Sequence, residues 1–273
     1  MNIFGSWGVV VFFSTIYLAV CPCPRGFAHD TGQAYVILGE STDLGTGATV
    51  PEKAWAAMFH EFLESKFFKS SADFHNYAVF GATVGDILRG QLADALSDIA
   101  SHNPVVVSLG GGGNDLLQFI SSPQAVTCLM VNLECVARLN ALLNNMEALF
   151  DEMVRKLRAA GPNIPILLRT EHNPFLKASC GGPDAGLTQL AHLVLEGKDN
   201  VPFLTSGLND RIRDVAARYN AKVIEVFLSF ASDPDDLLSD DCIHPNDAGH
   251  AVICEAAVFA FTHEKARGAT CKR

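Results

Sequence analysis

The sequence is short of positive charge, of long apolar runs and of closely spaced metal ligands. It has 20 Lys and Arg against 30 Asp and Glu, a formal net charge of −10. This balance disfavours a nucleic-acid partner, because binding to phosphates depends on basic side chains. No two cysteines have the Cys-x-x-Cys spacing of a zinc site and no His-Glu-x-x-His pattern occurs, so the spacing predicts no metal site.

An apolar run between Trp7 and Cys21 is shorter than the roughly 20 residues that cross a bilayer. The composition changes abruptly after Gly26-Phe27-Ala28, which is typical of a secretory signal peptide with small residues at its cleavage site. We therefore expect residues 1–28 to be removed and residues 29–273 to be secreted, with no stable membrane insertion. A lipid anchor or an uncleaved anchor stays open, because no Lys or Arg precedes the run and Leu18-Ala19-Val20-Cys21 half resembles a lipoprotein box.

Six cysteines follow the predicted signal, at positions 128, 135, 180, 242, 254 and 271. An even number in an oxidising compartment favours disulfides. Cys128 and Cys135 bracket a short loop that can close locally, so we predict a bond between them. Cys254 lies in an apolar helical pattern and is expected to be buried and inert. Pairing among Cys180, Cys242 and Cys271 stays open.

From Gln33 onward, short β-rich runs alternate with longer helical patterns, without an internal repeat or low-complexity linker. This alternation predicts a single three-layer α/β/α domain with a central five-stranded parallel sheet. The predicted strands are 35–38, 76–80, 104–109, 164–168 and 222–226, and the predicted helices are 51–68, 83–100, 136–160, 208–219 and 247–261. A loop-rich stretch covers 171–202.

Chemically useful residues follow several of these strands, although each has an ordinary explanation when taken alone. Ser41, in Gly39-Glu40-Ser41-Thr42, follows the first strand and is otherwise a turn or helix-cap serine. Gly81 follows the second strand and is otherwise a turn glycine. His244, three residues after Asp241, is otherwise a loop histidine paired with a nearby acid.

Four glycines, residues 110–113, precede Asn114 and Asp115 at the end of the third strand. A glycine-rich loop at this position can hold a phosphate, but this one lacks the Lys-Ser/Thr of a P-loop and the spacing of a dinucleotide fingerprint. The alternative use of these glycines is to bring the Asn114 amide close to a reacting centre, where an amide N–H can donate to an oxyanion.

The four motifs together resemble the SGNH or GDSL-type hydrolases, in that family's order and over nearly all of residues 33–262. Gly39-Glu40-Ser41-Thr42 is similar to the Gly-Asp-Ser-Leu block, with Glu40 and Thr42 replacing the usual Asp and Leu. Gly81 matches the glycine of the second block, 113–115 matches Gly-x-Asn-Asp, and 241–244 matches Asp-x-x-His. The resemblance implies a flavodoxin-like fold.

The resemblance also implies a serine ester hydrolase that needs no cofactor. Ser41 would attack an ester carbonyl, His244 would act as general base, and Asp241 would orient the imidazole. Backbone N–H groups of Ser41 and Gly81 and the Asn114 side chain would form the oxyanion hole.

The substrate stays open among small-molecule and glycan esters. The family includes short-chain esterases, lysophospholipases, thioesterases and carbohydrate O-deacetylases, and a catalytically inactive glycan-binding module on the same fold is the alternative from another class. The stretch 171–202 is expected either to wall an acyl pocket or, by preference, to form a flap packed on the core.

Overall fold

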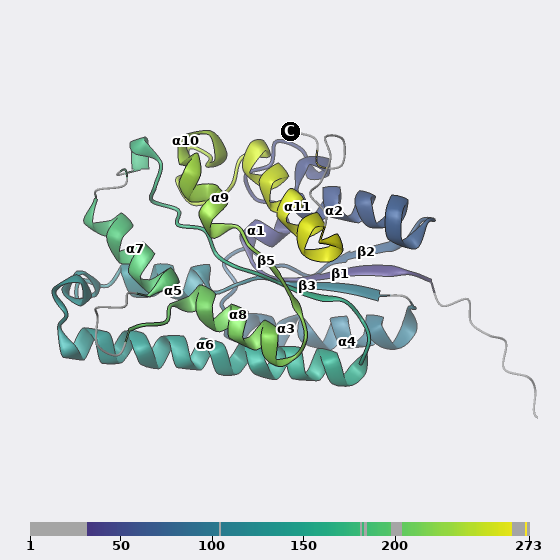
Figure 1. Cartoon of the computed structure of the whole chain (residues 1–273), viewed down its shortest axis with the longest axis horizontal. Helices are drawn as coiled ribbons and strands as arrows, with labels where there is room; N and C mark the ends of the chain where they lie inside the picture. Colours follow the sequence, from purple (N-terminus) through teal and green to yellow (C-terminus); the bar gives the residue numbers. More distant parts are fainter. Residues whose placement is uncertain are drawn as a thin grey trace, which may run out of the picture. The chain divides into compact units, whose positions relative to one another are not determined.

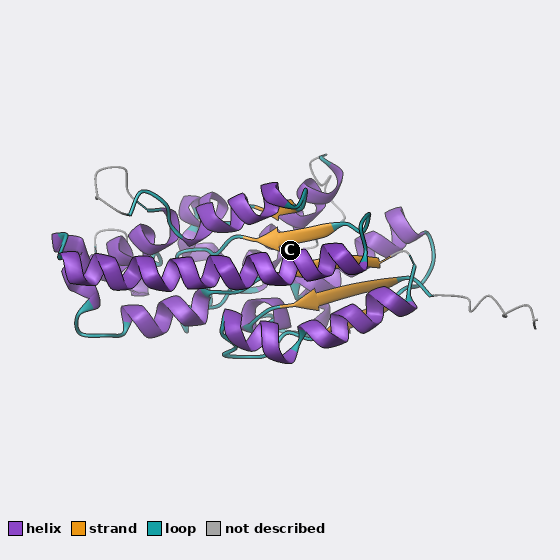
Figure 2. Cartoon of the chain, turned by 90° about the horizontal axis from the view of Figure 1, so that it is seen from below, coloured by secondary structure: helices purple, strands orange, loops and turns teal. Residues whose placement is uncertain are grey.

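Five short segments form one sheet in which all neighbouring strands run parallel, in the order β2-β1-β3-β4-β5. The computed structural model describes residues 32–103, 105–180, 182, 185–197, 204–263 and 271; the predicted signal peptide lies outside them. The strands are β1 (Ala34–Leu38), β2 (Asp73–Asn76), β3 (Val105–Leu109), β4 (Ile166–Arg169) and β5 (Lys222–Ile224). Figure 2 shows the strand arrows pointing the same way. The predicted single α/β domain with a five-stranded parallel sheet is confirmed.

Helices cover both faces of this sheet (Figure 1). The α-helices are α1 (Ser41–Leu44), α2 (Trp55–Leu63), α3 (Val84–Gly90), α4 (Leu92–Ser101), α5 (Gly113–Ile120), α6 (Leu133–Ala160), α7 (Gly186–Glu196), α8 (Leu208–Arg218), α9 (Phe227–Ser232), α10 (Pro234–Leu237) and α11 (Asp247–Thr262). Shorter turns are the 3₁₀ segments Pro51–Lys53, Ala125–Met130 and Ala178–Cys180 and the π-helical segment Glu64–Phe68.

The side chains of strand β1 show why helices must pack on both faces of the sheet. All five of its side chains are buried, and they alternate between two apolar clusters. Val36 belongs to the cluster beneath α3, α4, α6 and α8, whereas Tyr35 and Ile37 belong to the cluster beneath α2 and α11. A strand buried on both sides reads as a continuous apolar run, which is how β1 and β3 could be identified from the sequence.

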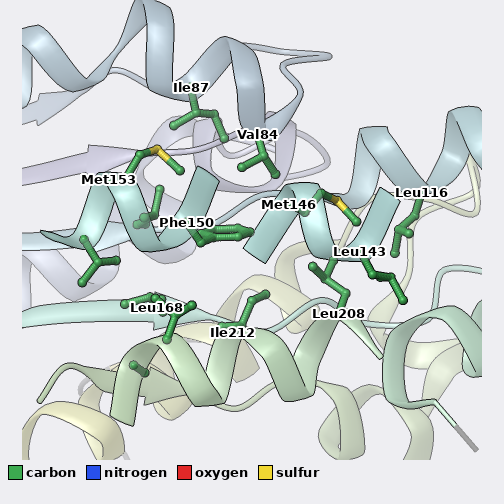
Figure 3. Close-up of a cluster of buried hydrophobic side chains, with 14 of the residues drawn as sticks. Val84, Ile87, Leu116, Leu143, Met146, Phe150, Met153, Leu168, Leu208 and Ile212 are labelled. Atoms are coloured by element: carbon green, nitrogen blue, oxygen red, sulfur yellow. The ribbon is translucent and has the colours of Figure 1, made fainter. Parts of the chain in front are cut away.

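The 28-residue helix α6 organises the larger of the two clusters. Its buried side chains recur every three or four residues, as expected for one apolar stripe, and Met146, Phe150 and Met153 face α3 and α8 in Figure 3. Phe150 is fully enclosed, so truncating it to Ala is expected to cost about 3–5 kcal/mol.

Three predicted elements differ from the observed ones. The α-helix predicted over 51–68 is limited to α2, between the 3₁₀ turn Pro51–Lys53 and the π-helical segment Glu64–Phe68. The predicted strand 76–80 lies earlier, at β2, because the chain leaves the sheet at Asn76, whose side chain binds the Asp43 carbonyl oxygen at 2.9 Å and the Ala78 N–H at 3.0 Å. Val79 and Phe80 beyond it are exposed. The single helix predicted over 83–100 is two helices, broken at Gln91.

Helices α1, α5 and α7, which lie near the site, were not predicted. Helix α5 begins inside the glycine-rich loop at Gly113, and α7 lies within the stretch predicted to be loop-rich. Among the described residues, no helix is both long enough and apolar enough to cross a membrane.

The described part of the chain contains three disulfides: Cys128–Cys135, Cys180–Cys242 and Cys254–Cys271. The first was predicted. Cys254 is buried as expected, but the expectation that it is inert is wrong, because it joins α11 to the segment that carries Cys271. An apolar helical pattern shows that a side chain is buried but not which other buried cysteine lies beside it.

Candidate active site

The turn that carries Ser41 leaves β1 at the point where the chain order of the sheet reverses. Leu38 of β1 pairs with Leu109 of β3, and the Gly110 N–H donates to the Leu38 carbonyl oxygen at 3.1 Å. The loops that follow the two strands therefore start side by side, with β2 on the other flank of β1. In parallel α/β sheets, this switch point at the carboxyl ends of the strands is where ligands bind.

Gly39 and Gln91 fix the backbone immediately before Ser41. The Gly39 N–H donates to the Gln91 side chain at 2.8 Å, and the Gln91 amide donates back to the Gly39 carbonyl oxygen at 2.9 Å. A Cβ at position 39 would lie 2.2 to 2.6 Å from atoms of the Asp43 side chain, so only glycine fits. The break between α3 and α4 is what places Gln91 at this turn.

Ser41, His244 and Asp241 form a continuous hydrogen-bonded chain. The Nε2 atom of His244 lies 2.9 Å from the Ser41 hydroxyl oxygen, and its Nδ1 atom lies 2.6 Å from an Asp241 carboxylate oxygen. Ser41 is the first residue of α1, while the other two residues lie in the loop before α11. The structure thus brings the Ser41 hydroxyl next to an imidazole 203 residues away in the sequence, with a carboxylate on the other ring nitrogen. This is the order of groups that proton abstraction from a hydroxyl requires.

Asp241 is held ionised by the loop around it. Partial burial opposes the charge, but the His244 N–H, the Ser239 hydroxyl, the His244 ring and the Ile243 N–H all donate to this carboxylate, and together they lower the pKa of Asp241 below its ordinary value. An ionised carboxylate at Nδ1 keeps the proton on that nitrogen and leaves Nε2 free to accept one from Ser41.

This loop is itself tied down from the segment before α7. Cys242, between Asp241 and Ile243, has a φ of 66° and is bonded to Cys180. Lys177 donates to the carbonyl oxygens of Leu238 and Ser239, at 3.1 and 3.3 Å. The position of the imidazole therefore depends on contacts that no spacing motif contains.

Asn114 lies at the start of α5 and lines the same cavity as Ser41. Its side-chain nitrogen donates to a Glu40 carboxyl oxygen at 2.9 Å and to the Ala82 carbonyl oxygen at 3.1 Å. Both amide hydrogens thus have acceptors. An oxyanion at this position would have to replace one of these acceptors or share a hydrogen with it. The next residue, Asp115, accepts the Val84 N–H at 2.9 Å and so joins α5 to α3.

Gly81 lies in the turn between β2 and α3 with a φ of 78°. It is next to Ala82, which binds Asn114, but it is not among the residues that line the cavity around Ser41. Its predicted place in an oxyanion hole rests on this neighbourhood and not on a direct contact.

Behind Ser41 lies a buried charged cluster that the sequence did not reveal, namely Arg169 at the end of β4 with Asp43, Glu171 and Glu40. The Arg169 guanidinium binds both carboxylate oxygens of Asp43, at 2.9 and 3.0 Å, and both of Glu171, at 3.1 and 3.0 Å. Burial and the charge of Glu171 raise the pKa of Glu40 well above its usual range. The signal that could have found the cluster is an arginine in an otherwise apolar strand.

A cavity of about 280 Å³ opens beside Ser41 and His244 and is mainly apolar. One wall comes from α5 and the other from the 171–197 segment, including α7, which packs against α5. Its apolar lining consists of Phe80, Leu116, Leu117, Ile120, Pro174, Phe175, Ala191, Val194, Leu195 and Ile243. The two readings of the 171–202 stretch are both correct in part, because α7 packs on the core with Leu190 and also walls the pocket with Val194.

His172 also lines this cavity, as a buried neutral imidazole. Its Nε2 atom lies 3.0 Å from the Ile243 carbonyl oxygen, and its ring stacks on Phe230 at 4.5 Å. Burial, and then the nearby Arg169 charge, lower its pKa from the ordinary 6.5 to about 3. His172 therefore supports the backbone next to His244 without carrying a charge.

Solved structures with the same fold include several lipolytic and esterolytic enzymes. A lipase from a goat rumen metagenome is 19% identical, with a TM-score of 0.63 over 84% of this chain and 97% of its own. Phospholipase A1 from Streptomyces albidoflavus is 21% identical, with a TM-score of 0.58 over 84% and 99%. The acetylxylan esterase Axe2 from Geobacillus stearothermophilus is 17% identical, with a TM-score of 0.57 over 87% and 97%.

No curated protein sequence matches the chain. A family model, by contrast, matches residues 37–252. This range begins within β1, just before Ser41, and ends within α11, just after His244, so it contains both ends of the hydrogen-bonded chain described above. The protein belongs to the GDSL-like lipase/acylhydrolase family.

Proposed function

We propose that this protein hydrolyses carboxylic esters through an acyl-enzyme on Ser41. The observation that carries the proposal is the 2.9 Å contact between His244 Nε2 and the Ser41 hydroxyl oxygen, at the rim of an apolar cavity. A hydroxyl becomes nucleophilic when an adjacent base takes its proton as the new bond forms.

The reaction would proceed in two halves. In the first, the Ser41 oxygen attacks the ester carbonyl carbon while its proton moves to His244 Nε2, and Asp241 stabilises the imidazolium. The same proton then passes to the alkoxy oxygen as the carbon–oxygen bond to the alcohol breaks. In the second, water gives a proton to His244 and attacks the acyl carbon, and that proton then passes to the Ser41 oxygen as the acyl–oxygen bond breaks, which releases the acid and restores Ser41 and His244.

The negative oxygen of each tetrahedral intermediate needs donors in place before the charge develops. The Ser41 N–H is at the start of α1, where a helix has no acceptor of its own for it. We assign this group, the Gly81 N–H and the Asn114 amide to the oxyanion hole, with one Asn114 hydrogen shifting from Glu40 or the Ala82 carbonyl oxygen to the substrate.

We further propose a substrate with an acyl chain of medium length. An acetyl group would leave most of the 280 Å³ cavity unfilled. An acyl chain of the order of six to ten carbons would instead extend from Ser41 along the apolar lining. Contact with Leu117, Ile120 and Val194 would favour such a chain over an acetylated sugar, since the lining offers few polar partners for hydroxyl groups.

We also propose that residues 1–28 direct export and that the mature domain, 29–273, is secreted. The three disulfides support this assignment, because such bonds persist in oxidising compartments. Mass spectrometry of the protein recovered from the medium of an expressing culture tests it: an N-terminus at residue 29 is expected, and an intact N-terminus would contradict cleavage.

A series of p-nitrophenyl esters from acetate to dodecanoate, with an acetylated xylo-oligosaccharide beside it, tests the activity and the chain length. We expect kcat/KM to rise to a maximum between hexanoate and decanoate, and a serine-directed phosphonate to abolish turnover. Release of acetate from the sugar at a higher kcat/KM than any aryl ester would indicate a carbohydrate O-deacetylase. An absence of turnover on every ester would leave the glycan-binding alternative.

A further inference from the structure

Three metal-ligating side chains meet at the end of the sheet opposite Ser41. Asp73 and His75 lie on β2, with Asp73 as its first residue, and His102 follows α4 directly. Each offers one ligand atom, and these atoms lie within 4.8 Å of one another. Ser41 follows the carboxyl end of β1, whereas Asp73 pairs with Ala34 at its amino end, so this cluster is separate from the proposed active site.

The spacing of two of the ligand atoms fits a single small cation. His102 Nε2 lies 3.2 Å from an Asp73 carboxylate oxygen. Two ligands of a tetrahedral zinc ion, each about 2.0–2.1 Å from the metal, are about 3.3 Å apart. Bringing a ring nitrogen of His75 to the same distance requires a shift of the order of 1.5 Å, which a change in the rotamer of a partly exposed side chain supplies.

Asp98, on α4, lies next to the Nδ1 atoms of both imidazoles and is a hydrogen-bond partner of His102. The Nδ1 atom of His102 lies 3.0 Å from the Asp98 carbonyl oxygen, and Nδ1 of His75 lies 2.7 Å from its carboxylate. Tyr77 donates to the same carboxylate at 2.8 Å. A metal-binding histidine typically gives its second ring nitrogen to a carboxylate or carbonyl oxygen, which fixes the tautomer and the ring orientation.

Of the two imidazoles, His75 has a ring nitrogen without a hydrogen-bond partner among the described residues. The His102 Nε2 atom lies within hydrogen-bond distance of the Asp73 carboxylate, and a cation would take the place of the proton between them. The His75 Nδ1 atom is enclosed and close to Asp98 but out of line for a hydrogen bond.

We propose that Asp73, His75 and His102 bind one divalent cation of the zinc class, with water completing the coordination and Asp98 as the supporting residue. Two imidazoles and one carboxylate suit zinc, whereas calcium and magnesium require oxygen ligands. The ion would join the edge strand β2 to the end of α4, across 29 residues of chain between Asp73 and His102. Its role would be structural, since the site lies away from Ser41.

Calorimetric titration of ZnCl₂ into tag-free protein tests the proposal directly. We expect one zinc per chain, at least tenfold weaker binding after His75→Gln or His102→Gln, and 10- to 100-fold weaker binding after Asp98→Asn. His192→Gln, which removes an exposed histidine on α7, is the matched control and should bind like wild type. Calcium and magnesium should give no heat of specific binding.

Two measurements keep the result interpretable. Circular dichroism checks that each variant is folded, and Co²⁺ in place of zinc should give the visible absorption of a four-coordinate site only when both histidines are present. Ser41→Ala should bind zinc as wild type does, whatever its effect on ester turnover. Binding that survives the His75 and His102 changes, or that His192→Gln weakens equally, would overturn the proposal, as would a cobalt spectrum without four-coordinate bands.

Discussion

Truncating Asn114 to Ala tests the proposed oxyanion hole most directly, because its side chain has both a structural and a catalytic assignment. The Asn114 amide braces Glu40 and the Ala82 carbonyl oxygen in the resting state. In the transition state, one of its hydrogens would instead donate to the oxyanion. The variant therefore affects two measurable quantities, the free energy of unfolding and kcat.

The structure sets the expected size of each effect. Loss of one oxyanion donor costs about 2.7–4 kcal/mol, a 10²- to 10³-fold fall in kcat. We expect the lower end, near 10², because the hydrogen must leave an existing partner before it reaches the oxyanion. The free energy of unfolding should fall by about 1–2 kcal/mol, because the buried Glu40 carboxyl group loses the Asn114 amide as a donor. This is the lower part of the usual range, since Glu40 keeps the Asn114 backbone N–H, at 3.3 Å, as a second donor.

Asp115→Ala is the matched control for Asn114→Ala. Asp115 is the next residue of α5 and binds the Val84 N–H at 2.9 Å, but it is not among the residues that line the cavity. It should lose about 1 kcal/mol of stability and keep kcat within a few-fold. The assay is kcat and KM on p-nitrophenyl hexanoate together with urea unfolding. If Asn114→Ala behaved like Asp115→Ala, with stability lost and kcat preserved, Asn114 would be only a brace.

Four other perturbations have expected outcomes. Ser41→Ala should unfold like wild type and lose all but a few per cent of kcat; retained turnover would remove Ser41 as the nucleophile. Serine replacement of both cysteines of the Cys180–Cys242 bond should cost about 4 kcal/mol by loop entropy and lower kcat, whereas loss of the Cys128–Cys135 bond should cost about 2.5 kcal/mol and leave kcat unchanged. For His172, whose pKa falls to about 3 on folding, only the unfolded chain gains the proton below pH 6.5. The free energy of unfolding should therefore fall by up to about 1.4 kcal/mol for each pH unit of acidification. His172→Gln should make the urea midpoint depend less steeply on pH between pH 6 and pH 4; the same pH dependence as wild type would contradict this.

The elements that could be predicted from the sequence are those whose burial is evident from the local spacing of their apolar residues. Strands β1 and β3 and the long helix α6 repeat apolar residues at the period of their own structure, so their place in the core could be predicted without knowledge of their neighbours. Helix α5 was missed because four glycines precede Asn114, and α7 was missed because its segment is rich in turn residues. The two helices pack against each other and the core, and these contacts compensate for the low helix propensity of both segments.

In the candidate site, too, the residues in local motifs could be predicted and those that meet only in the folded chain could not. Ser41, Asn114 and the Asp241–His244 pair occur in short motifs at strand ends or in loops, and the order of the motifs was enough to select them. Gln91 and Arg169 could not be selected, because they belong to no motif. Gln91 binds Gly39 and Arg169 binds Asp43 only after folding has brought distant segments together.

The cluster of Asp73, His75 and His102, for which we propose metal binding, could not be predicted for the same reason as Gln91 and Arg169. Asp73 and His75 stand 27 or more residues before His102 in the sequence, so they match no metal-binding spacing. They meet only because β2 lies at the sheet edge beside the end of α4.

Glu40, the departure from the usual Asp, has a consequence for the charge of the site. Arg169 binds Asp43 and Glu171 directly, which leaves Glu40 as the buried carboxyl group without a basic partner of its own. Three buried negative charges against one positive charge are costly, so we expect Glu40 to hold a proton, in the direction that burial and Glu171 shift its pKa. A neutral Glu40 beside Asn114 spares the developing oxyanion a repulsive neighbour.

Glu40→Gln tests this last expectation, because it removes the ability to ionise while it keeps size and an acceptor oxygen for the Asn114 amide. If Glu40 is already neutral, kcat on p-nitrophenyl hexanoate should stay within a few-fold of wild type at pH 7 and the unfolding temperature should change little. Glu40→Ala is the contrasting variant, since it removes the acceptor and leaves the buried amide without one of its partners; both stability and kcat should then fall. A large loss of kcat in Glu40→Gln, as severe as that of Glu40→Ala, would show that the carboxylate charge is needed and that the proton lies elsewhere in the cluster.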